Sequence, residues 1–270
     1  MVRIPITMCH GIRHDGNYPL TSDHLGRLVK IAAELNFESI NYNQLFQWFR
    51  EGRKLPPRPI MFDFDHPVKS MRYEIHDVLN EYGYAGNLFI NTGPVDELYA
   101  KPMPPDPLRE IMTWDEIGQL IERGWHIGAH TVTHPNLSEL SLQDASGEKL
   151  RAELEQCDET LKKYLGITPQ DFAFTGTSWS SIAEREVSKR YRFGRLWIVG
   201  TEYQVDGKTM RYADLVGVDG PDEEDGGPPM TARYITKDSP PYRLPSMEIQ
   251  RPLIYDPDAF RRYLEGALRV

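Results

Sequence analysis

Strand-like and helix-like segments alternate along almost the whole chain of 270 residues. Short apolar runs are followed by longer segments whose apolar residues recur at helical spacing. This alternation predicts an α/β fold with a mainly parallel sheet. The expected strands cover residues 3–9, 59–64, 86–90, 125–129, 172–174, 194–199 and 242–249, and the expected helices cover 21–36, 43–50, 70–82, 113–123, 147–165 and 258–268. Because no shift of composition marks a boundary, we expect residues 1–270 to form one domain.

Composition and charge exclude several classes of protein. Hydrophobic residues make up 40% and charged residues 26% of the chain, the balance of a globular enzyme. The formal net charge is −9 and no run of Lys and Arg stands out, so we expect neither a nucleic-acid nor an anionic-membrane partner. The first 16 residues predict neither a signal peptide nor a membrane span, which favours a cytoplasmic protein unless a leader was removed. The oligomeric state stays open, a homo-oligomer included.

Two other features have modest interpretations. Cys9 and Cys157 form no metal-binding spacing and are expected to be buried free thiols. Residues 219–229 form an acidic segment that is expected to be a solvated loop and the most mobile part of the chain. Its composition does not decide whether it is a lid, a contact with a partner or a segment with neither role.

The expected strand at 59–64 ends in an unusual cluster of Asp63, Asp65 and His66. Functional groups gather past the carboxyl ends of strands in such folds. Two carboxylates two residues apart point to the same side if the strand continues through them, and they repel unless a cation lies between them. One carboxylate then binds a metal while the other stays ionised as a base. The simpler interpretation, an Asp that caps a turn, carries about equal weight.

A pair of histidines, His130 and His134, follows the expected strand at 125–129. Histidines at i and i+4 lie on one face of a helical turn, a spacing that suits two imidazoles on one ion. Together with Asp65 they make a three-ligand site with positions left for water, the open arrangement of a catalytic metal. Zinc is the first choice for one divalent ion in this site, and cobalt, nickel or manganese also fits.

These segments resemble the signatures of a known family. GWHIGAHTVTHPNL, residues 124–137, is similar to the second signature of the NodB-type polysaccharide deacetylases (carbohydrate esterase family four), and PIMFDFDHP, residues 59–67, resembles a variant of their first. The N-terminal part, residues 5–67, resembles the subgroup of biofilm poly-N-acetylglucosamine deacetylases. The resemblance spans almost the whole chain.

The resemblance implies a distorted (β/α) barrel that hydrolyses the N-acetyl amide of a sugar. Carried over to this sequence, it implies that Asp65, His130 and His134 hold the metal and that Asp63 is the catalytic base. His10 matches a histidine near the site in the biofilm subgroup, so it is a candidate for substrate contact. A strand-end histidine bonded to a neighbouring carbonyl is the equally weighted alternative.

The chain departs from the family pattern in three places. Phe64 separates two acids that are adjacent in most relatives, and residues 174–177 replace the stretch that supplies an arginine partner for the base, so Asp63 is expected to lack that partner. The family has a general-acid histidine near its C-terminus, but no histidine follows His134 in this sequence. The proton for the leaving amine then comes from His10, His66, Asp63 or a water. The remaining candidates for substrate contact are Thr175 and Trp179, and both Trp179 and Trp48 are more readily explained as core residues.

Three functions compete at this point. The leading hypothesis is N-deacetylation of an N-acetylated sugar or glycan. The alternative within enzymes is a small-molecule amidohydrolase that opens a cyclic imide or an allantoin-like ring. A catalytically silent member that binds glycan is the third.

Overall fold

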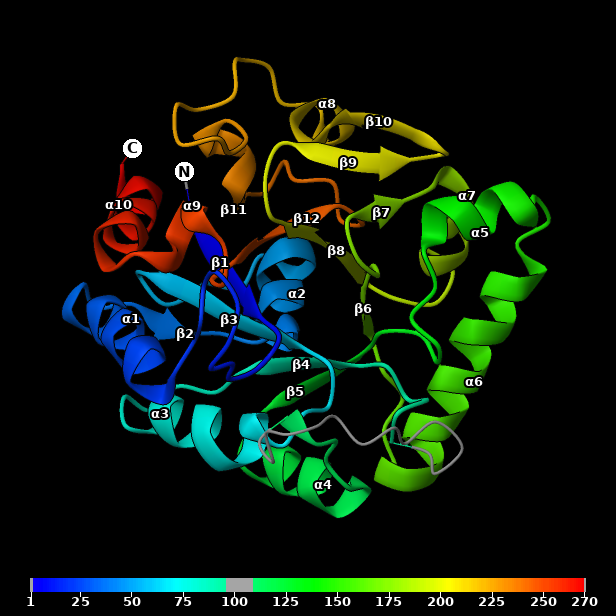
Figure 1. The fold of residues 1–270 in the computed structure, drawn as a ribbon, viewed down its shortest axis with the longest axis horizontal. Helices are drawn as coiled ribbons and strands as arrows, with labels where there is room; N and C mark the ends of the chain where they lie inside the picture. The colour runs from blue at the N-terminus through cyan, green and yellow to red at the C-terminus, as the bar shows by residue number, and fades with distance from the viewer. Residues whose placement is uncertain (1, 96–108, 270) are drawn as a thin grey trace.

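The computed structural model describes residues 2–95 and 109–269, and within them parallel strands close into a barrel (Figure 1). Each barrel strand pairs in parallel with the next, and the last pairs with the first, which closes a seven-stranded ring. In ring order the strands are β1 (Ile4–Cys9), β3 (Pro59–Asp65), β4 (Asn87–Ile90), β5 (His126–Ala129), β6 (Asp171–Ala173), β8 (Phe193–Ile198) and β12 (Leu244–Glu248). The predicted (β/α) barrel is confirmed.

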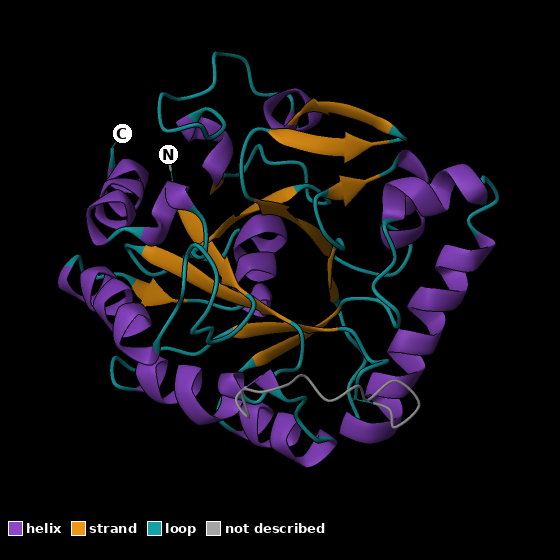
Figure 2. Cartoon of the chain, in the orientation of Figure 1, coloured by secondary structure: helices purple, strands orange, loops and turns teal. Residues whose placement is uncertain are grey.

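Helices cover the outside of the ring (Figure 2). They are α1 (Ser22–Glu34), α3 (His76–Asn80), α4 (Trp114–Glu122), α5 (Leu137–Gln143), α6 (Glu148–Leu165), α7 (Ser181–Val187), α8 (Tyr212–Val216), α9 (Pro252–Tyr255) and α10 (Pro257–Leu268). The helix expected at 70–82 begins instead with the π-helical turn η1 (Met71–Ile75) and continues as α3. Thr113 and Glu116 form the predicted capping box of α4. No helix in residues 2–95 and 109–269 has the length and apolar character that crossing a bilayer requires.

Short elements lie at the edges of the barrel. The strands β2 (Glu38–Ser39) and β11 (Tyr234–Ile235) extend the sheet, and η3 (Met230–Arg233) precedes β11. A second sheet contains β7 (Ser178–Trp179), β9 (Glu202–Val205) and β10 (Lys208–Arg211). Next to it, the acidic segment 219–229 is tied down by ion pairs from Arg211 to Asp222 at 2.8 Å and from Arg233 to Asp225 at 2.6 Å.

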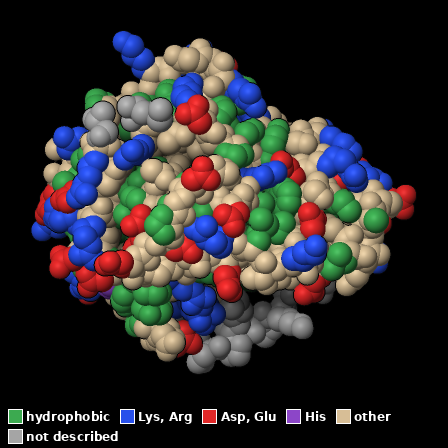
Figure 3. All heavy atoms as spheres, turned by 90° about the horizontal axis from the view of Figure 1, so that it is seen from above, with side chains coloured by type: hydrophobic (Ala, Val, Ile, Leu, Met, Phe, Trp, Pro, Cys, Tyr) green, Lys and Arg blue, Asp and Glu red, His purple; other side chains and the backbone are tan. Residues whose placement is uncertain are grey.

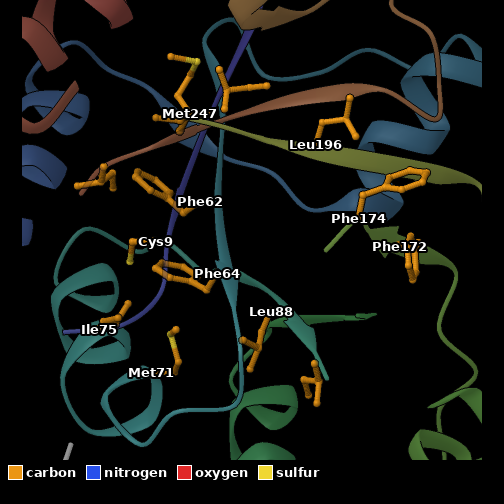
Figure 4. Close-up of a cluster of buried hydrophobic side chains, with 14 of the residues drawn as sticks. Cys9, Phe62, Phe64, Met71, Ile75, Leu88, Phe172, Phe174, Leu196 and Met247 are labelled. Carbon is orange, nitrogen blue, oxygen red and sulfur yellow. The ribbon is translucent and has the colours of Figure 1, made fainter. Parts of the chain in front are cut away.

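The two-residue period of β3 separates its side chains into two layers. Ile60, Phe62 and Phe64 belong to the apolar cluster between the strands and the outer helices, where Figure 4 shows Phe62 and Phe64 beside Cys9. Met61 belongs to a separate cluster, which β1, β4, β6, β8 and β12 also supply. Asp63 and Asp65 share the inward face with Met61, so the alternation of β3 points both carboxylates into the barrel.

Helix α2 (Tyr42–Glu51) closes the amino-terminal end of the barrel and is seen through the ring in Figure 1. Its residues Tyr42, Leu45 and Trp48 pack in the same cluster as the side chains at the amino ends of the barrel strands. Trp48 is buried, and the Lys237 ammonium lies 4.4 Å from the centre of its ring. This packing confirms the core interpretation of Trp48 and leaves the carboxyl end of the barrel as the open end. Both cysteines are free and buried, as predicted.

Candidate metal and catalytic site

Three histidines meet at the carboxyl ends of β3 and β5. One ligand nitrogen from each of His66, His130 and His134 lies within 4.8 Å of the others. A divalent ion binds imidazole nitrogen at about 2.0–2.1 Å, so small side-chain rotations bring all three onto one ion. The sequence predicted His130 and His134 as a pair, and the structure adds His66. Asp65 lies at the edge of this set, with Oδ2 3.8 Å from Nε2 of His130.

Hydrogen bonds fix the ring orientation of two of these histidines. The Nδ1 atom of His130 lies 2.8 Å from the carbonyl oxygen of Ala173, and Nδ1 of His66 lies 2.8 Å from Oδ1 of Asn91. Because a carbonyl oxygen only accepts, Nδ1 carries the proton in each ring and Nε2 keeps its lone pair. Nε2 of His130 is buried with no hydrogen-bond partner among the described residues. A buried acceptor without a partner is costly unless a ligand binds it, so the donor set fits a metal ion.

The loop that carries His130 and His134 is not a helical turn, so that part of the prediction was wrong. Thr131 and His134 have φ values of 66° and 60°, and His66 has 69°. Left-handed backbone at residues other than glycine is uncommon and is often found at functional sites. Glu153 on α6 holds the loop by accepting bonds from the backbone N–H groups of residues 132 and 133, at 2.8 and 2.9 Å.

Arg195 on β8 is fully buried between the two carboxylates of β3. It donates to Oδ1 of Asp65 and places Nε 3.4 Å from Oδ2 of Asp63. Its guanidinium lies 4.9 Å from the centre of the Phe89 ring. A Cβ atom at position 128 would lie 2.4 Å from an atom of that ring, so a residue larger than glycine would displace the ring. The expectation that Asp63 lacks an arginine partner is therefore wrong, because the arginine comes from β8 instead of residues 174–177.

The two carboxylates have opposite electrostatic environments. Asp63 accepts from the Tyr42 hydroxyl at 2.7 Å and from the Asn87 amide at 3.0 Å, yet complete burial still raises its pKa to about 7. Burial also acts to raise the pKa of Asp65, but the Arg195 guanidinium and the nearby imidazoles hold it well below its usual value. Asp65 is therefore ionised at neutral pH, and Asp63 lies deeper with both oxygens already bonded.

His10 forms a second pair beside the histidine cluster. Its Nδ1 lies 3.0 Å from Oε2 of Glu248, the last residue of β12, and its ring centre lies 5.3 Å from that of His66. Burial alone would lower the pKa of His10, but the Glu248 carboxylate raises it above its ordinary value. Trp197 also donates its indole N–H to Glu248 at 2.8 Å. A role for Glu248 was not predicted. The only sign of one in the sequence is that a single acidic residue stands at the end of an apolar strand.

A cavity of about 500 Å³ opens beside these groups, and His10, His66, Asn91, Trp197 and Glu248 are among the residues that line it. The remaining predicted candidates lie elsewhere. Thr175 is buried and donates to the carbonyl of Pro135. Trp179 is 5% exposed in the apolar core and donates its indole N–H to Glu184 at 3.0 Å. Both side chains have structural contacts, and a role of either in substrate contact stays a prediction.

Replacing Asn91 with alanine is expected to weaken metal binding by about 10- to 100-fold, because His66 loses the acceptor that orients its ring. Competition with a chelating dye measures this affinity. Asn80→Ala changes an exposed asparagine at the end of α3 and is the matched control. Equal affinity of the Asn91 variant and the unaltered protein would contradict a role of His66 in holding the ion.

Comparison with known proteins identifies the family. The polysaccharide deacetylase family model matches residues 52–193, more than half of the chain. The protein belongs to the polysaccharide deacetylase family, as the motifs predicted. The matched segment contains β3 and β5 with all three clustered histidines, and it ends before Arg195. No curated protein matches the sequence.

Solved structures show the same fold at low sequence identity. Streptococcus pyogenes deacetylase PplD in complex with acetate aligns with a TM-score of 0.70 at 14% identity, covering 97% of this chain and 98% of PplD. IcaB from Ammonifex degensii aligns at 0.69 and 11% identity, covering 100% and 98%. The BpsB deacetylase domain from Bordetella bronchiseptica aligns at 0.66 and 13% identity, covering 92% and 96%. The fold is therefore shared over almost the whole of these three chains.

Proposed function

We propose that the protein removes the acetyl group from an N-acetylated sugar by hydrolysing its amide bond, with one divalent ion held by His66, His130 and His134. The observation that carries this proposal is the three-histidine cluster, which includes a buried nitrogen without a partner, at the open end of a polysaccharide deacetylase barrel. An ion bound there supplies a Lewis acid that polarises a carbonyl and makes water more acidic. Zinc is the first choice for three imidazoles, and cobalt, nickel or manganese follows.

The roles that we propose for the two carboxylates of β3 differ from those that the sequence suggested. Asp65 was expected to bind the metal and Asp63 to act as the base. Instead, Asp65 acts as the base, since it is ionised, faces His130 and is fixed by Arg195. A water that attacks the amide carbonyl passes its proton to Asp65. Asp63, whose oxygens accept hydrogen bonds from Tyr42 and Asn87, helps to position Arg195.

The proton for the leaving amine comes from His10 in this proposal. The Glu248 carboxylate favours the protonated imidazole and orients it, and the ring lines the cavity beside His66. An oriented imidazolium at the entrance to the site is suited to general acid catalysis. This pair takes the place of the missing C-terminal histidine.

His10→Gln is expected to lower kcat by about 100-fold or more while leaving the metal content unchanged, because the leaving amine loses its proton donor. Steady-state kinetics and metal analysis of the same sample measure the two effects. His24→Gln is the control, since His24 bonds the backbone carbonyl of Tyr255 at 2.8 Å and does not line the cavity. Unchanged kcat in the His10 variant would remove it from the mechanism.

Acetate release tests the proposed function. The protein is incubated with N-acetylglucosamine and its oligomers, and acetate and free amine are measured together. Equal amounts of both products, lost with a chelator and restored by zinc, would support deacetylation. Ring opening of a cyclic imide without acetate would favour the amidohydrolase alternative. Sugar binding without any turnover would favour the silent binding protein.

A further inference from the structure

Three arginines line the same cavity as His10 and His66. They are Arg13, Arg109 and Arg251. The cavity of about 500 Å³ has the size of a site for one small ligand. None of these arginines has a role in the reaction proposed above, which needs only a metal, a base and an acid.

Each arginine comes from a connection at the carboxyl end of the barrel. Arg13 follows β1 in a loop closed by two backbone bonds with Leu20, at 2.8 and 2.7 Å. Arg251 lies three residues after the end of β12 and is the N-cap residue of α9. Arg109 lies next to the backbone bridge between Val68 and Ile111. The chain thus brings three guanidinium groups to the cavity from separate segments, and backbone bonds hold the segments of Arg13 and Arg109 in place.

The carboxylates near these arginines leave their charge largely uncompensated. Asp15 lies 3.6 Å from Arg13 and 3.7 Å from Arg109, but its side chain is 69% exposed, and such surface pairs are weak. Nε of Arg13, the atom that lies 3.6 Å from Asp15, is buried and has no partner within hydrogen-bond distance among the described residues. Glu248 is already bonded to His10 and Trp197. The Arg251 guanidinium lies 5.8 Å from the centre of the Trp197 ring and forms no ion pair with a described carboxylate.

This cluster contrasts with the charge of the whole chain. The net charge is −9, and the face drawn in Figure 3 carries acidic and basic side chains interspersed. An acidic protein repels anionic ligands unless local positive charge attracts them. Guanidinium groups bind carboxylate and phosphate oxygens in a fixed, often bidentate geometry. A neutral amino sugar has no anionic group for these guanidinium groups to bind.

We infer that the substrate of this site is a small N-acylated sugar that also carries an anionic group, a carboxylate or a phosphate ester, bound by Arg13, Arg109 and Arg251. The inference rests on the proposed deacetylation for the identity of the amide and on the arginines alone for the charge. In this inference the arginines bind the anionic group while the amide faces His66 and His10.

Binding by calorimetry tests the charge preference without requiring turnover. The ligands are N-acetylglucosamine, its 6-phosphate, and N-acetylmuramic acid, which adds a carboxylate to the same sugar. One or both anionic sugars are expected to bind at least about tenfold more tightly than the neutral one, because hydrogen bonds between charged groups are stronger than those between neutral groups. Comparing the two anionic sugars distinguishes phosphate from carboxylate.

The arginine variants locate the effect. Arg109→Gln combined with Arg251→Gln is expected to remove most of the preference for the anionic sugar. Arg53→Gln removes the same charge at an exposed position beside Glu51, just after α2 at the opposite end of the barrel, and is expected to keep the preference. Equal binding of the charged and neutral sugars, no binding of either anionic sugar, or a preference that survives the double substitution would overturn the inference.

Acetate release is measured in parallel to separate the two proposals. Anion-selective binding without acetate from any sugar would contradict the proposed function and retain the anion site. Acetate release at equal efficiency from charged and neutral sugars would retain the proposed function and contradict the anion site.

Discussion

His66→Ala is expected to abolish binding of the proposed divalent ion and to reduce acetate release by about a thousandfold or more, because a catalytic metal contributes several kcal/mol to the reaction. His66 supplies one of three clustered nitrogens, and its ring is already oriented by Asn91. Two remaining imidazoles bind an ion much more weakly than three. Metal content per chain, measured by mass spectrometry of the dialysed protein, is the primary result.

Asp65→Asn is the matched comparison for this prediction. The proposal makes Asp65 a base rather than a ligand, so this variant is expected to keep about one ion per chain while turnover falls by about 100-fold or more. The assignment suggested by the sequence, with Asp65 as the ligand, predicts the opposite pattern. Metal lost in Asp65→Asn and retained in His66→Ala would restore that earlier assignment.

Arg195→Met is expected to lower the free energy of unfolding by about 3–5 kcal/mol, the cost of leaving buried charges without their partner. Asp63 and Asp65 both face the buried guanidinium, and their pairing depends on it. The loss is measured by urea denaturation, followed by fluorescence and circular dichroism. Arg195→Lys keeps the charge without the planar geometry, and its loss is expected to be intermediate, which provides a result if the methionine variant does not fold.

Arg261→Met is the control for this experiment. Arg261 on α10 pairs with Glu34 at 2.9 Å, but both side chains are more than a third exposed, so its replacement is expected to cost less than about 1 kcal/mol. If Arg195→Met unfolded within about 1 kcal/mol of the unaltered protein, the account of Arg195 as the partner of both carboxylates would be wrong.

The strands and helices were predictable because their signals are local. The apolar run of β3 and the capping residues Thr113 and Glu116 act on their own neighbourhood. The helix expected at 70–82 was less accurate, since the π-helical turn at its start leaves the apolar spacing almost unchanged. The closure of the ring, by contrast, depends on β1 pairing with both β3 and β12, which no single segment encodes.

The candidate site was predictable only where its residues form a pattern in the chain. His130 and His134 were found by their spacing, although the left-handed residue Thr131, and not a helical turn, brings them together. His66 was noticed, but its place among the clustered nitrogens depends on the fold. Arg195 and Glu248 were missed because each is a single charged residue in an apolar strand, and its partners lie far away in sequence. A charged residue on the inward face of a strand would be the signal for such a site. A single sequence does not show which face of a strand points into the barrel.

The site of metal binding is the central claim, and anomalous X-ray scattering at the zinc absorption edge tests it most directly. Crystals of the protein loaded with zinc are expected to show one strong peak bonded to nitrogens of His66, His130 and His134, with Asp65 still bonded to Arg195. A peak bonded to carboxylates of Asp63 and Asp65, or no peak at the carboxyl end of the barrel, would contradict the account.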